Sequence, residues 1–337
     1  MPNIALLPEL KKDFAQIYYI GTNGIEKELI KNVHDVEFKE ISAAKLERDK
    51  FYKIFALPFK LHKSINEAKR ILKQIKPAVI FSKGGYVSVP AVIAAHKLKI
   101  PIVSHESDLS MGLANKIIKH YCDIMCTSFE ETAKNQKKCV FTGTPIRREL
   151  LSGTKQKGKA MCKIDESKPT VLFIGGSSGA VAINNILYKV LPSLTKRYNI
   201  VHIAGRNKGN SSIICPNYTQ FEYVKDIEDI YALTDFVVSR AGSNAINEFL
   251  FLKKPMLLIP LPKGASRGDQ LENARLFKNK GYAEVLEQQN LNEITLLEAL
   301  TDLEKNKQHL INNMKAAKNA NACKKIAEVI QGALNNN

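Results

Sequence analysis

The sequence predicts an α/β protein with two doubly wound domains that face each other across a cleft. Short runs rich in β-branched residues alternate with amphipathic stretches along all 337 residues, which is the pattern of βαβ units around parallel sheets. The polar, Gly- and Lys-rich stretch Ser152–Lys168 has no clear period and is typical of a linker. A second series of strands then begins with its own glycine-rich turn. We therefore expect a first domain over residues 1–152, completed by a C-terminal helix at about 318–337, and a second domain over 153–317.

The strands of each half are expected where β-branched and apolar residues cluster. In the first half they are Gln16–Ile20, Ala78–Phe81, Ile102–Ser104, Ile124–Cys126 and Val140–Phe141. In the second half they are Val171–Ile174, Ile200–Ile203, Phe221–Tyr223, Phe236–Ser239 and Met256–Ile259. Amphipathic spacing predicts helices between most of them, including Ser64–Gln74, Gly112–His120, Asn184–Leu194 and Gln270–Lys280, and the closing segment Leu297–Leu334 is helical by pattern.

The composition limits the classes of partner. The formal net charge of +17 indicates an anionic partner, which is a nucleic acid, a membrane surface or a phosphorylated substrate. Aromatic residues make up 7% of the chain and Trp is absent, so stacking platforms for bases are scarce. We therefore expect a phosphorylated ligand or an anionic membrane and no nucleic acid. The sequence indicates no particular protein partner.

Cysteine spacing and hydropathy favour a cytoplasmic protein. The six cysteines are scattered without a C-x-x-C pair, so neither a disulfide framework nor a cysteine-based metal site is expected. The charged residues at positions 9–13 are unlike a signal peptide, and no apolar run is long enough to cross a bilayer. Any membrane contact is therefore expected to be peripheral.

The sharpest local pattern is the segment Val171–Ala180, a strand that runs into three glycines and then a helix. Glycines at 175, 176 and 179 let backbone N–H groups approach an anion, and the following helix directs its positive end to the same place. Ser177 and Ser178 would add hydroxyl donors. A tight turn whose glycines serve packing is the alternative, and phosphate binding is favoured over it.

Two later loops carry polar groups at helix starts. In Ser239–Asn244 an arginine, Arg240, is placed to meet a phosphate, and Glu248 one turn further on is placed to accept hydrogen bonds from a ribose. The segment Pro260–Ala274 places Asp269, Gln270 and Asn273 at another helix start, where they suit sugar hydroxyls. Each also has a plainer explanation, since an exposed helical Glu is common and Asp and Asn are favoured as caps.

The first half repeats this arrangement. Ser82–Pro90 joins a strand to a helix through two glycines, His105–Asp108 follows the next strand and precedes Gly112 and Asn115, and Gly143–Arg147 lies near the domain boundary. Any one of these segments could be a structural turn. Because such turns occur at strand ends in both halves, together they favour a binding site.

Taken together, these segments resemble one family, the peptidoglycan UDP-N-acetylglucosamine transferases known as the MurG family. Its patterns K-G-G-(Y/F)-x-S-x-P, H-E-x-(N/D), G-(N/T)-P-(I/V)-R and G-G-S-x-G-A match Lys83–Pro90, His105–Asp108, Gly143–Arg147 and Gly175–Ala180. R-(A/S)-G followed by a helical Glu matches Arg240–Gly242 with Glu248, and Q-x-x-N-A matches Gln270–Ala274. Order and spacing are similar from about residue 2 to about residue 285.

The resemblance implies a GT-B fold and an inverting glycosyl transfer. N-acetylglucosamine would pass from UDP to the C4 hydroxyl of the muramyl sugar in undecaprenyl-pyrophosphoryl-MurNAc-pentapeptide (lipid I). The product would be lipid II, a precursor of the cell wall, made at the cytoplasmic face of the plasma membrane. The second domain would bind the donor, UDP-GlcNAc, and the first would face the membrane and the acceptor.

The resemblance also implies roles for individual residues. Tyr223 and Val224 would lie against uracil, Glu248 on the ribose, and Arg147 near the hinge. The remaining donor residues would be Gly176, Ser177, Ser178, Arg240, Gly242, Gln270 and Asn273, with Asp269 standing where the family often has a second Gln. The acceptor side would be lined by Lys83, Gly84, Gly85, Tyr86, His105, Asp108 and Asn115.

Members of this family open with a strand and a loop of the form G-G-T-x-G-H-x-x-P, which is expected to supply the general base. Here Met1 directly precedes Pro2, and the following residues match the family from that proline onward. The first strand and its loop are therefore expected to be absent, which leaves His105 as a candidate substitute base or, by preference, a structural residue. Either the start codon is misassigned or the chain is a true truncation, and the in-frame nucleotide sequence upstream distinguishes the two.

Neither a tightly bound metal nor another cofactor is expected. The chain contains no D-x-D motif, and the acidic segment Asp226–Asp229 is better explained as a helix cap. Charge on the departing UDP would be stabilised by glycine-turn amides and helix N-termini, and loosely bound Mg²⁺ remains compatible with this scheme.

A membrane contact is expected at Lys50–Lys63, where bulky apolar residues are interleaved with lysines. That composition suits a surface dipping into the headgroups of an anionic bilayer, and the Lys-rich Ser64–Lys76 would extend it. An ordinary amphipathic helix buried on one face is the alternative.

Two other functions fit parts of the pattern. One is a different UDP-sugar transferase that acts on a membrane lipid, such as a diacylglycerol glycosyltransferase, which would prefer UDP-glucose. The other is a non-catalytic, UDP-binding scaffold of the wall-synthesis machinery, which would bind UDP without turnover.

Overall fold

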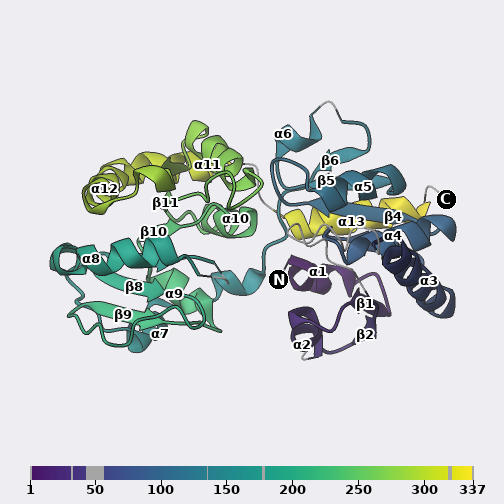
Figure 1. Ribbon diagram of the computed structural model, residues 1–337, viewed down its shortest axis with the longest axis horizontal. Coiled ribbons are helices and arrows are strands. Elements are labelled where there is room, and N and C mark those ends of the chain that lie inside the picture. The colour runs from purple at the N-terminus through teal and green to yellow at the C-terminus, as the bar shows by residue number, and fades with distance from the viewer. Residues whose placement is uncertain are drawn as a thin grey trace. The chain divides into compact units, whose positions relative to one another are not determined.

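The structure is a computed structural model that describes residues 2–31, 33–42, 57–134, 136–176, 179–317 and 321–335. The chain divides into two compact units (Figure 1). The first unit comprises Met1–Ile146 with Asn321–Asn337, and the second comprises Arg147–Ala320. Each unit is an α/β layered body around parallel strands, so the predicted fold class is confirmed.

The second unit is built on a six-stranded parallel sheet in the order β12-β11-β10-β7-β8-β9. Its strands are β7 (Thr170–Ile174), β8 (Asn199–Ile203), β9 (Tyr218–Phe221), β10 (Phe236–Ser239), β11 (Met256–Leu258) and β12 (Ala283–Val285). Strands β7, β8, β10 and β11 are buried along their whole length, which explains their continuous apolar sequences. The chain order reverses between β7 and β10, and ligands bind at the carboxyl ends of strands beside such a switch point.

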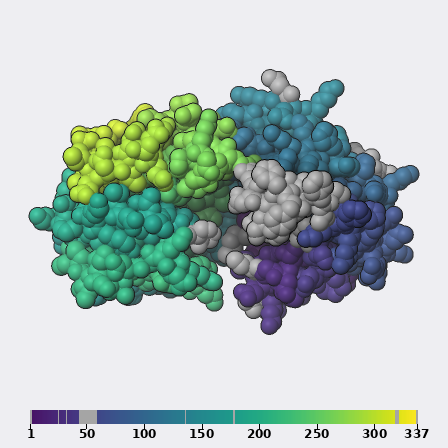
Figure 2. Space-filling view, viewed as in Figure 1, coloured from purple at the N-terminus to yellow at the C-terminus, as the bar shows by residue number. Residues whose placement is uncertain are grey.

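Helices connect these strands. They are α7 (Lys155–Met161), α8 (Val181–Arg197), α9 (Ile227–Leu233), α10 (Ser243–Phe251), α11 (Asp269–Asn279) and α12 (Glu293–Lys315), with short 3-10 helices η2 (Arg148–Leu151) and η3 (Gln288–Asn290). The helices α8 and α12 contact each other, and their teal and yellow surfaces adjoin in Figure 2. An ion pair of 2.7 Å joins Arg197 to Glu304. The helix α12 is therefore fixed to the second unit.

The first unit contains two separate parallel sheets. A four-stranded sheet has the order β3-β4-β5-β6 and a two-stranded sheet pairs β1 with β2. The strands are β1 (Ile17–Gly21), β2 (Val36–Glu40), β3 (Ile80–Ser82), β4 (Ile102–Glu106), β5 (Ile124–Thr127) and β6 (Cys139–Phe141). The helices are α1 (Pro2–Leu10), α2 (Ile25–Lys31), α3 (Leu57–Ile75), α4 (Ser88–Lys97), α5 (Leu113–Tyr121), α6 (Glu130–Ala133) and α13 (Ala322–Asn335). Strands β1 and β3 are thus both edge strands.

The C-terminal helix α13 packs within the first unit. Figure 1 shows it, at the yellow end of the chain, among the blue elements of that unit. Ile326 and Ile330 are buried in one cluster with Leu6 of α1 and Val103 of β4. The Cys323 thiol also donates a hydrogen bond to the carbonyl of Ala5, 3.4 Å away. A helix distant in sequence therefore contributes to the core of the first unit.

The predicted linker is wrong in part, because residues 155–161 form the helix α7. Gly158, which suggested a linker, lies where α7 packs on α9. A Cβ atom at Gly158 would lie 2.4 Å from the carbonyl oxygen of Asp229. The glycine therefore permits close helix packing rather than chain flexibility.

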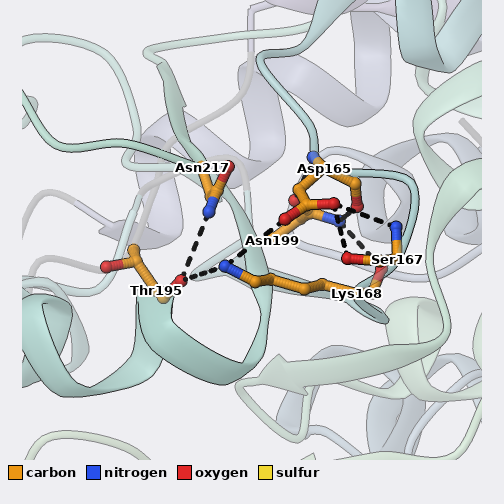
Figure 3. A network of polar contacts seen from close by, with 6 residues as sticks. All are labelled: Asp165, Ser167, Lys168, Thr195, Asn199 and Asn217. Atoms are coloured by element: carbon orange, nitrogen blue, oxygen red, sulfur yellow. Dashed lines mark hydrogen bonds and ion pairs between the residues drawn. The ribbon is translucent and has the colours of Figure 1, made fainter.

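The end of the predicted linker is held by side chains, as Figure 3 shows. Asn199, at the start of β8, accepts a hydrogen bond from the backbone N–H of Asp165 at 2.7 Å. Its amide also donates to the carbonyls of Asp165 and Lys168, each at 2.9 Å. The Lys168 ammonium donates to the carbonyl of Thr195 at 3.1 Å. This turn is therefore part of the folded second unit.

Three strands differ from the sequence prediction. Strand β9 covers Tyr218–Phe221 rather than Phe221–Tyr223, and β2 and β12 were not predicted. All three contain polar residues on partly exposed faces, so they lack the continuous apolar run that marks a buried strand.

Candidate functional site

The glycine turn of the second unit lies at the carboxyl end of β7 and leads into α8. Gly176 and Gly179 have φ angles of 75° and 67°, which residues other than glycine rarely adopt. A Cβ atom at Gly175 would lie 2.3 Å from the backbone nitrogen of Ala180, and one at Gly179 would lie 2.3 Å from the carbonyl oxygen of Ala204. Among the described residues, no heavy atom lies within 4 Å of a Cβ placed at Gly176. The turn thus presents backbone and the N-terminus of a 17-residue helix at one place, as anion binding requires.

Ser177 and Ser178, which were predicted to add hydroxyl donors to this turn, lie outside the described residues.

Arg240 lies at the carboxyl end of β10, as predicted, but its guanidinium contacts backbone. The residue is 8% exposed, and its Nη1 donates to the carbonyls of Ile259 and Pro260 at 3.0 and 3.5 Å. Burial lowers the pKa of Arg240 from its ordinary value. Arg240 therefore joins the loop after β10 to the loop after β11, and Gly242 between it and α10 has open space beyond its Cα.

Glu248 lies one turn into α10, and its carboxylate is held within the second unit. The Tyr231 hydroxyl donates to Glu248 Oε2 at 3.3 Å. Burial raises the pKa of Glu248, while the positive charge of Arg147 and the Tyr231 hydrogen bond oppose that shift. The Nε of Arg147 is buried without a hydrogen-bond partner among the described residues. Glu248 is thus a hydrogen-bond acceptor held in a fixed position, and it takes up a proton at a higher pH than an ordinary carboxylate does.

The start of α11 brings the predicted sugar-binding residues together. Gly268 precedes the helix with a φ of 89°, and the Gln270 side-chain oxygen accepts a hydrogen bond from the N–H of Leu261 at 3.1 Å. Asn273 is fully buried and donates to the carbonyl of Ala241 at 3.2 Å. Asp269 pairs with Arg267 at 3.9 Å. Gln270 and Asn273 therefore fix neighbouring loops, whereas Asp269 forms an ion pair with Arg267.

Tyr223 and Val224 follow β9 directly. Val224 is buried, whereas Tyr223 is 53% exposed. The guanidinium of Arg206, from the loop after β8, lies over the Tyr223 ring at 5.3 Å from its centroid. Sequence reasoning missed Arg206, although a cation that directly follows a glycine at a strand end was a visible signal.

In the first unit, Lys83 and His105 form a hydrogen-bonded pair at the carboxyl ends of β3 and β4. The Lys83 ammonium lies 2.6 Å from His105 Nδ1 and 2.6 Å from the Ser107 hydroxyl. His105 Nε2 lies 2.9 Å from the carbonyl of Gly143, so Nε2 carries the proton and donates to that carbonyl, and Nδ1 accepts a hydrogen bond from the Lys83 ammonium. Burial, reinforced by the Lys83 charge, lowers the pKa of His105 well below its ordinary value. With both ring nitrogens bound internally and the ring fully buried, the geometry favours a structural role for His105.

Burial also lowers the pKa of Lys83 to about 7, against the opposing negative charges of Glu106 and Asp108. A lysine in this position changes its charge near neutral pH.

Glu106 organises the loop after β4, and sequence reasoning did not single it out. It is 4% exposed, and its two oxygens accept hydrogen bonds from the N–H groups of Asp108 and Gly112 at 2.9 and 3.0 Å. Oε2 also accepts from the amide of Asn115 at 2.9 Å. A buried carboxylate at the end of β4 requires such partners.

The glycine turn of the first unit lies next to this loop. Gly84 and Gly85 have φ angles of 83° and 86°, and a Cβ atom at Gly84 would lie 2.5 Å from Asn115 Oδ1. That oxygen is buried without a hydrogen-bond partner in the described part of the chain. Tyr86 at the end of the turn is 40% exposed. The turn, Tyr86 and Asn115 are therefore grouped at one edge of the sheet.

Across the described ranges, no group of three or more His, Cys, Asp or Glu side chains is placed to hold a metal ion. The predicted cap at Asp226–Asp229 is only partly right. Asp226 precedes α9 without a side-chain cap bond, and Asp229 instead accepts from the N–H of Thr154 at 2.8 Å.

Comparisons with known proteins cover nearly the whole chain. Residues 1–127 match the glycosyltransferase family 28 N-terminal domain, and residues 170–330 match the glycosyltransferase family 28 C-terminal domain. A UDP-N-acetylglucosamine–N-acetylmuramyl-(pentapeptide) pyrophosphoryl-undecaprenol N-acetylglucosamine transferase of Clostridium botulinum (strain Alaska E43 / Type E3) is 48% identical over 334 residues. That alignment covers 98% of this chain and 93% of the relative. The Clostridium perfringens (strain 13 / Type A) protein of the same name is 46% identical over 335 residues, or 98% of this chain and 94% of the relative.

Solved structures share the fold. Acinetobacter baumannii MurG has a TM-score of 0.76 at 24% identity, with 98% of this chain and 95% of that chain covered. The UDP-GlcNAc 2-epimerase of Neisseria meningitidis, solved with UDP-GlcNAc, has a TM-score of 0.66 at 14% identity, with 99% and 95% covered. The resemblance inferred from the motifs is confirmed by the sequence matches. The chain therefore belongs to the MurG family of N-acetylglucosamine transferases, within glycosyltransferase family 28.

Proposed function

We propose that this protein transfers N-acetylglucosamine from UDP-GlcNAc to the C4 hydroxyl of lipid I, with inversion, and so forms lipid II for peptidoglycan synthesis. The observation that carries the proposal is the 48% identity, over 98% of the chain, to a relative whose name describes this donor and this acceptor. The glycine turn, Glu248 and Tyr223 at the carboxyl ends of the second-unit strands supply the matching chemistry.

Donor binding is assigned to the second unit. The diphosphate would accept hydrogen bonds from backbone N–H groups around Gly176 and from Ser177 or Ser178, at the positive end of α8. The Glu248 carboxylate would accept from the ribose hydroxyls, and uracil would lie against Tyr223 and Val224. Near the start of α11, Asp269 and Gln270 are the side chains assigned to the sugar.

The chemical demand is stabilisation of charge on departing UDP. As the bond between the sugar and the diphosphate breaks, negative charge grows on the diphosphate oxygens, and fixed N–H dipoles stabilise it without reorganising. This scheme uses no tightly bound metal, and a loosely held Mg²⁺ on the diphosphate is compatible with it. Arg240 would act by holding the loops around the diphosphate, since its guanidinium already binds the carbonyl of Ile259.

Acceptor binding is assigned to the first unit. Tyr86, Asp108 and the unpartnered oxygen of Asn115 would meet the muramyl sugar, on a turn formed by Gly84 and Gly85. Lys83 and His105 lie beneath this turn, where they hold the loops after β3, β4 and β6 together. A lysine that titrates near pH 7 would make acceptor binding sensitive to pH.

Membrane contact is assigned to α3. Ala68 and Leu72 are buried in the first unit, and the opposite face is basic and exposed. Phe59, at the start of the helix, is 81% exposed beside Lys60 and Lys63. Residues 50–56 of the segment predicted to contact the membrane lie outside the described residues, and no described helix is long and apolar enough to cross a bilayer. We propose peripheral attachment to an anionic membrane at the cytoplasmic face.

The activity itself is tested by coupled UDP release. The protein should release UDP from UDP-GlcNAc only when a lipid I analogue is present. Gly179→Ala should lower kcat/KM at least tenfold, because the added Cβ would lie 2.3 Å from the carbonyl oxygen of Ala204. Gly332→Ala, in α13 with open space around it, is the matched control and should keep full activity. A preference for UDP-glucose would contradict the proposal, and so would UDP binding without turnover in a chain extended by the family's G-G-T-x-G-H loop.

Donor affinity should weaken as pH falls through the raised pKa of Glu248. The carboxylate must be ionised to accept hydrogen bonds from both ribose hydroxyls, and burial makes it take up a proton at a higher pH than an ordinary Glu. Calorimetry of UDP binding between about pH 4.5 and 7.5 should show this acid limb. Glu248→Gln should bind UDP more weakly at pH 7 and lose the limb. A limb that survives in Glu248→Gln assigns the pH dependence to another group.

Membrane attachment is tested by sedimentation with phosphatidylglycerol vesicles. Replacing Lys60 and Lys63 with Gln removes two charges, each worth about 1 kcal/mol near an anionic surface, so vesicle affinity should fall roughly thirtyfold. Lys196→Gln with Lys305→Gln removes two exposed charges from the second unit and should leave affinity unchanged. Equal losses in both double variants would show that the attraction is non-specific.

A further inference from the structure

The loop Ala204–Lys208, which follows β8, packs directly on the glycine turn of the second unit. A Cβ atom at Gly179 would lie 2.3 Å from the carbonyl oxygen of Ala204 and 3.0 Å from Cδ of Lys208. Gly205 within the loop has a φ of 95°, which allows the chain to turn sharply at the end of the strand. The loop therefore lies against the segment to which the donor diphosphate is assigned.

A buried polar network fixes the position of this loop. The amide of Asn184, in α8, donates to the carbonyls of Ala204 and Lys208 at 3.0 and 3.4 Å. Its oxygen is then the acceptor for His202 Nε2 at 3.0 Å, which leaves His202 Nδ1 facing the Tyr218 hydroxyl at 3.0 Å. Burial lowers the pKa of His202 to about 4, so the ring is neutral at physiological pH. Asn184, His202 and Tyr218 are at most 5% exposed, so this network supports the loop from the interior of the second unit.

Arg206 extends from this loop toward the segment assigned to uracil. Its guanidinium lies 5.3 Å from the centroid of the Tyr223 ring, and the N–H of Asn207 donates to Glu222 Oε2 at 3.2 Å. The loops after β8 and β9 are therefore joined at two points. Arg206 thus lies on a loop that contacts both the glycine turn, through Ala204 and Lys208, and the segment that carries Tyr223.

A second arginine of the same unit, Arg197, also contacts a tyrosine ring but has its charge paired. Arg197 also lies 5.3 Å from a tyrosine ring, that of Tyr198, but at the amino end of β8. There its charge is paired with Glu304 at 2.7 Å. Within the described part of the chain, no carboxylate forms an ion pair with Arg206. Its charge is therefore available to an anion from outside the chain.

We propose that Arg206 is a further donor-binding residue, whose guanidinium meets the diphosphate of UDP while its stem packs on Tyr223. This inference rests on the proposed function of the second unit. A guanidinium suits the position because it forms paired hydrogen bonds to phosphate oxygens and stacks on aromatic rings. It would add a mobile cation to the fixed N–H groups of the glycine turn, opposite the charge that grows on the leaving group.

The test compares the binding of UDP and of uridine by calorimetry. Arg206→Gln should weaken UDP binding roughly tenfold to a hundredfold, the usual cost of a lost hydrogen bond to a charged group, and leave uridine binding within about twofold. Arg206→Lys should recover part of the UDP affinity, because it restores the charge but not the planar fork. Arg197→Gln, which removes the paired arginine stacked on Tyr198, is the matched control and should bind both ligands as the unmodified protein does.

Three results would overturn the assignment. Equal losses for UDP and uridine would mean that Arg206 acts only through the Tyr223 ring, and unchanged UDP affinity would mean that it makes no donor contact. If Arg206→Gln binds uridine and UDP normally but no longer turns over UDP-GlcNAc, Arg206 acts in the reaction and not in donor binding. If the unmodified protein does not bind UDP at all, the proposed function of the second unit fails. In the other three results the unmodified protein still binds UDP, so only the role of Arg206 fails.

Discussion

Buried polar side chains bind the backbone carbonyls of neighbouring loops at the carboxyl ends of the strands, and both units depend on these bonds. In the second unit, Arg240 binds the carbonyl of Ile259 and Asn273 binds that of Ala241. In the first unit, His105 binds the carbonyl of Gly143. A buried donor without such a partner costs roughly 1 to 3 kcal/mol, so each pairing strongly favours one arrangement of the loops.

This arrangement leaves the glycine turns free for a ligand. Within each unit, the side chains beneath hold the loops, and among the described residues no heavy atom lies within 4 Å of a Cβ placed at Gly176 or at Gly85. The backbone at these two glycines is open to a ligand, and the N-terminus of α8 follows the turn that carries Gly176. Binding and support are thus divided between backbone and side chains, so that the ligand meets a preorganised surface.

Much of the fold could be predicted from the sequence, because buried parallel strands are continuous apolar runs and the glycine motifs follow them. Strands β2, β9 and β12 escaped or shifted because their exposed faces interrupt that signal. The candidate residues lie at strand ends and helix starts, as their sequence positions indicated, but the directions of their side chains could not be predicted. An Asn or Arg at a helix start looks the same in sequence whether it faces a ligand or, like Asn273, a neighbouring carbonyl. Arg206 was missed because its contact with Tyr223 joins two different loops, and Glu106 because its importance depends on how the loop after β4 folds around it.

The central claim is that the donor binds at the carboxyl ends of the second-unit strands. Hydrogen–deuterium exchange with and without UDP tests it most directly, because bound phosphate should protect the amides that face it. We predict slower exchange in the turn after β7, in the loop after β8 that carries Arg206, and at the start of α10. Protection confined to the loops that carry Lys83 and His105, with none in the second unit, would contradict the account.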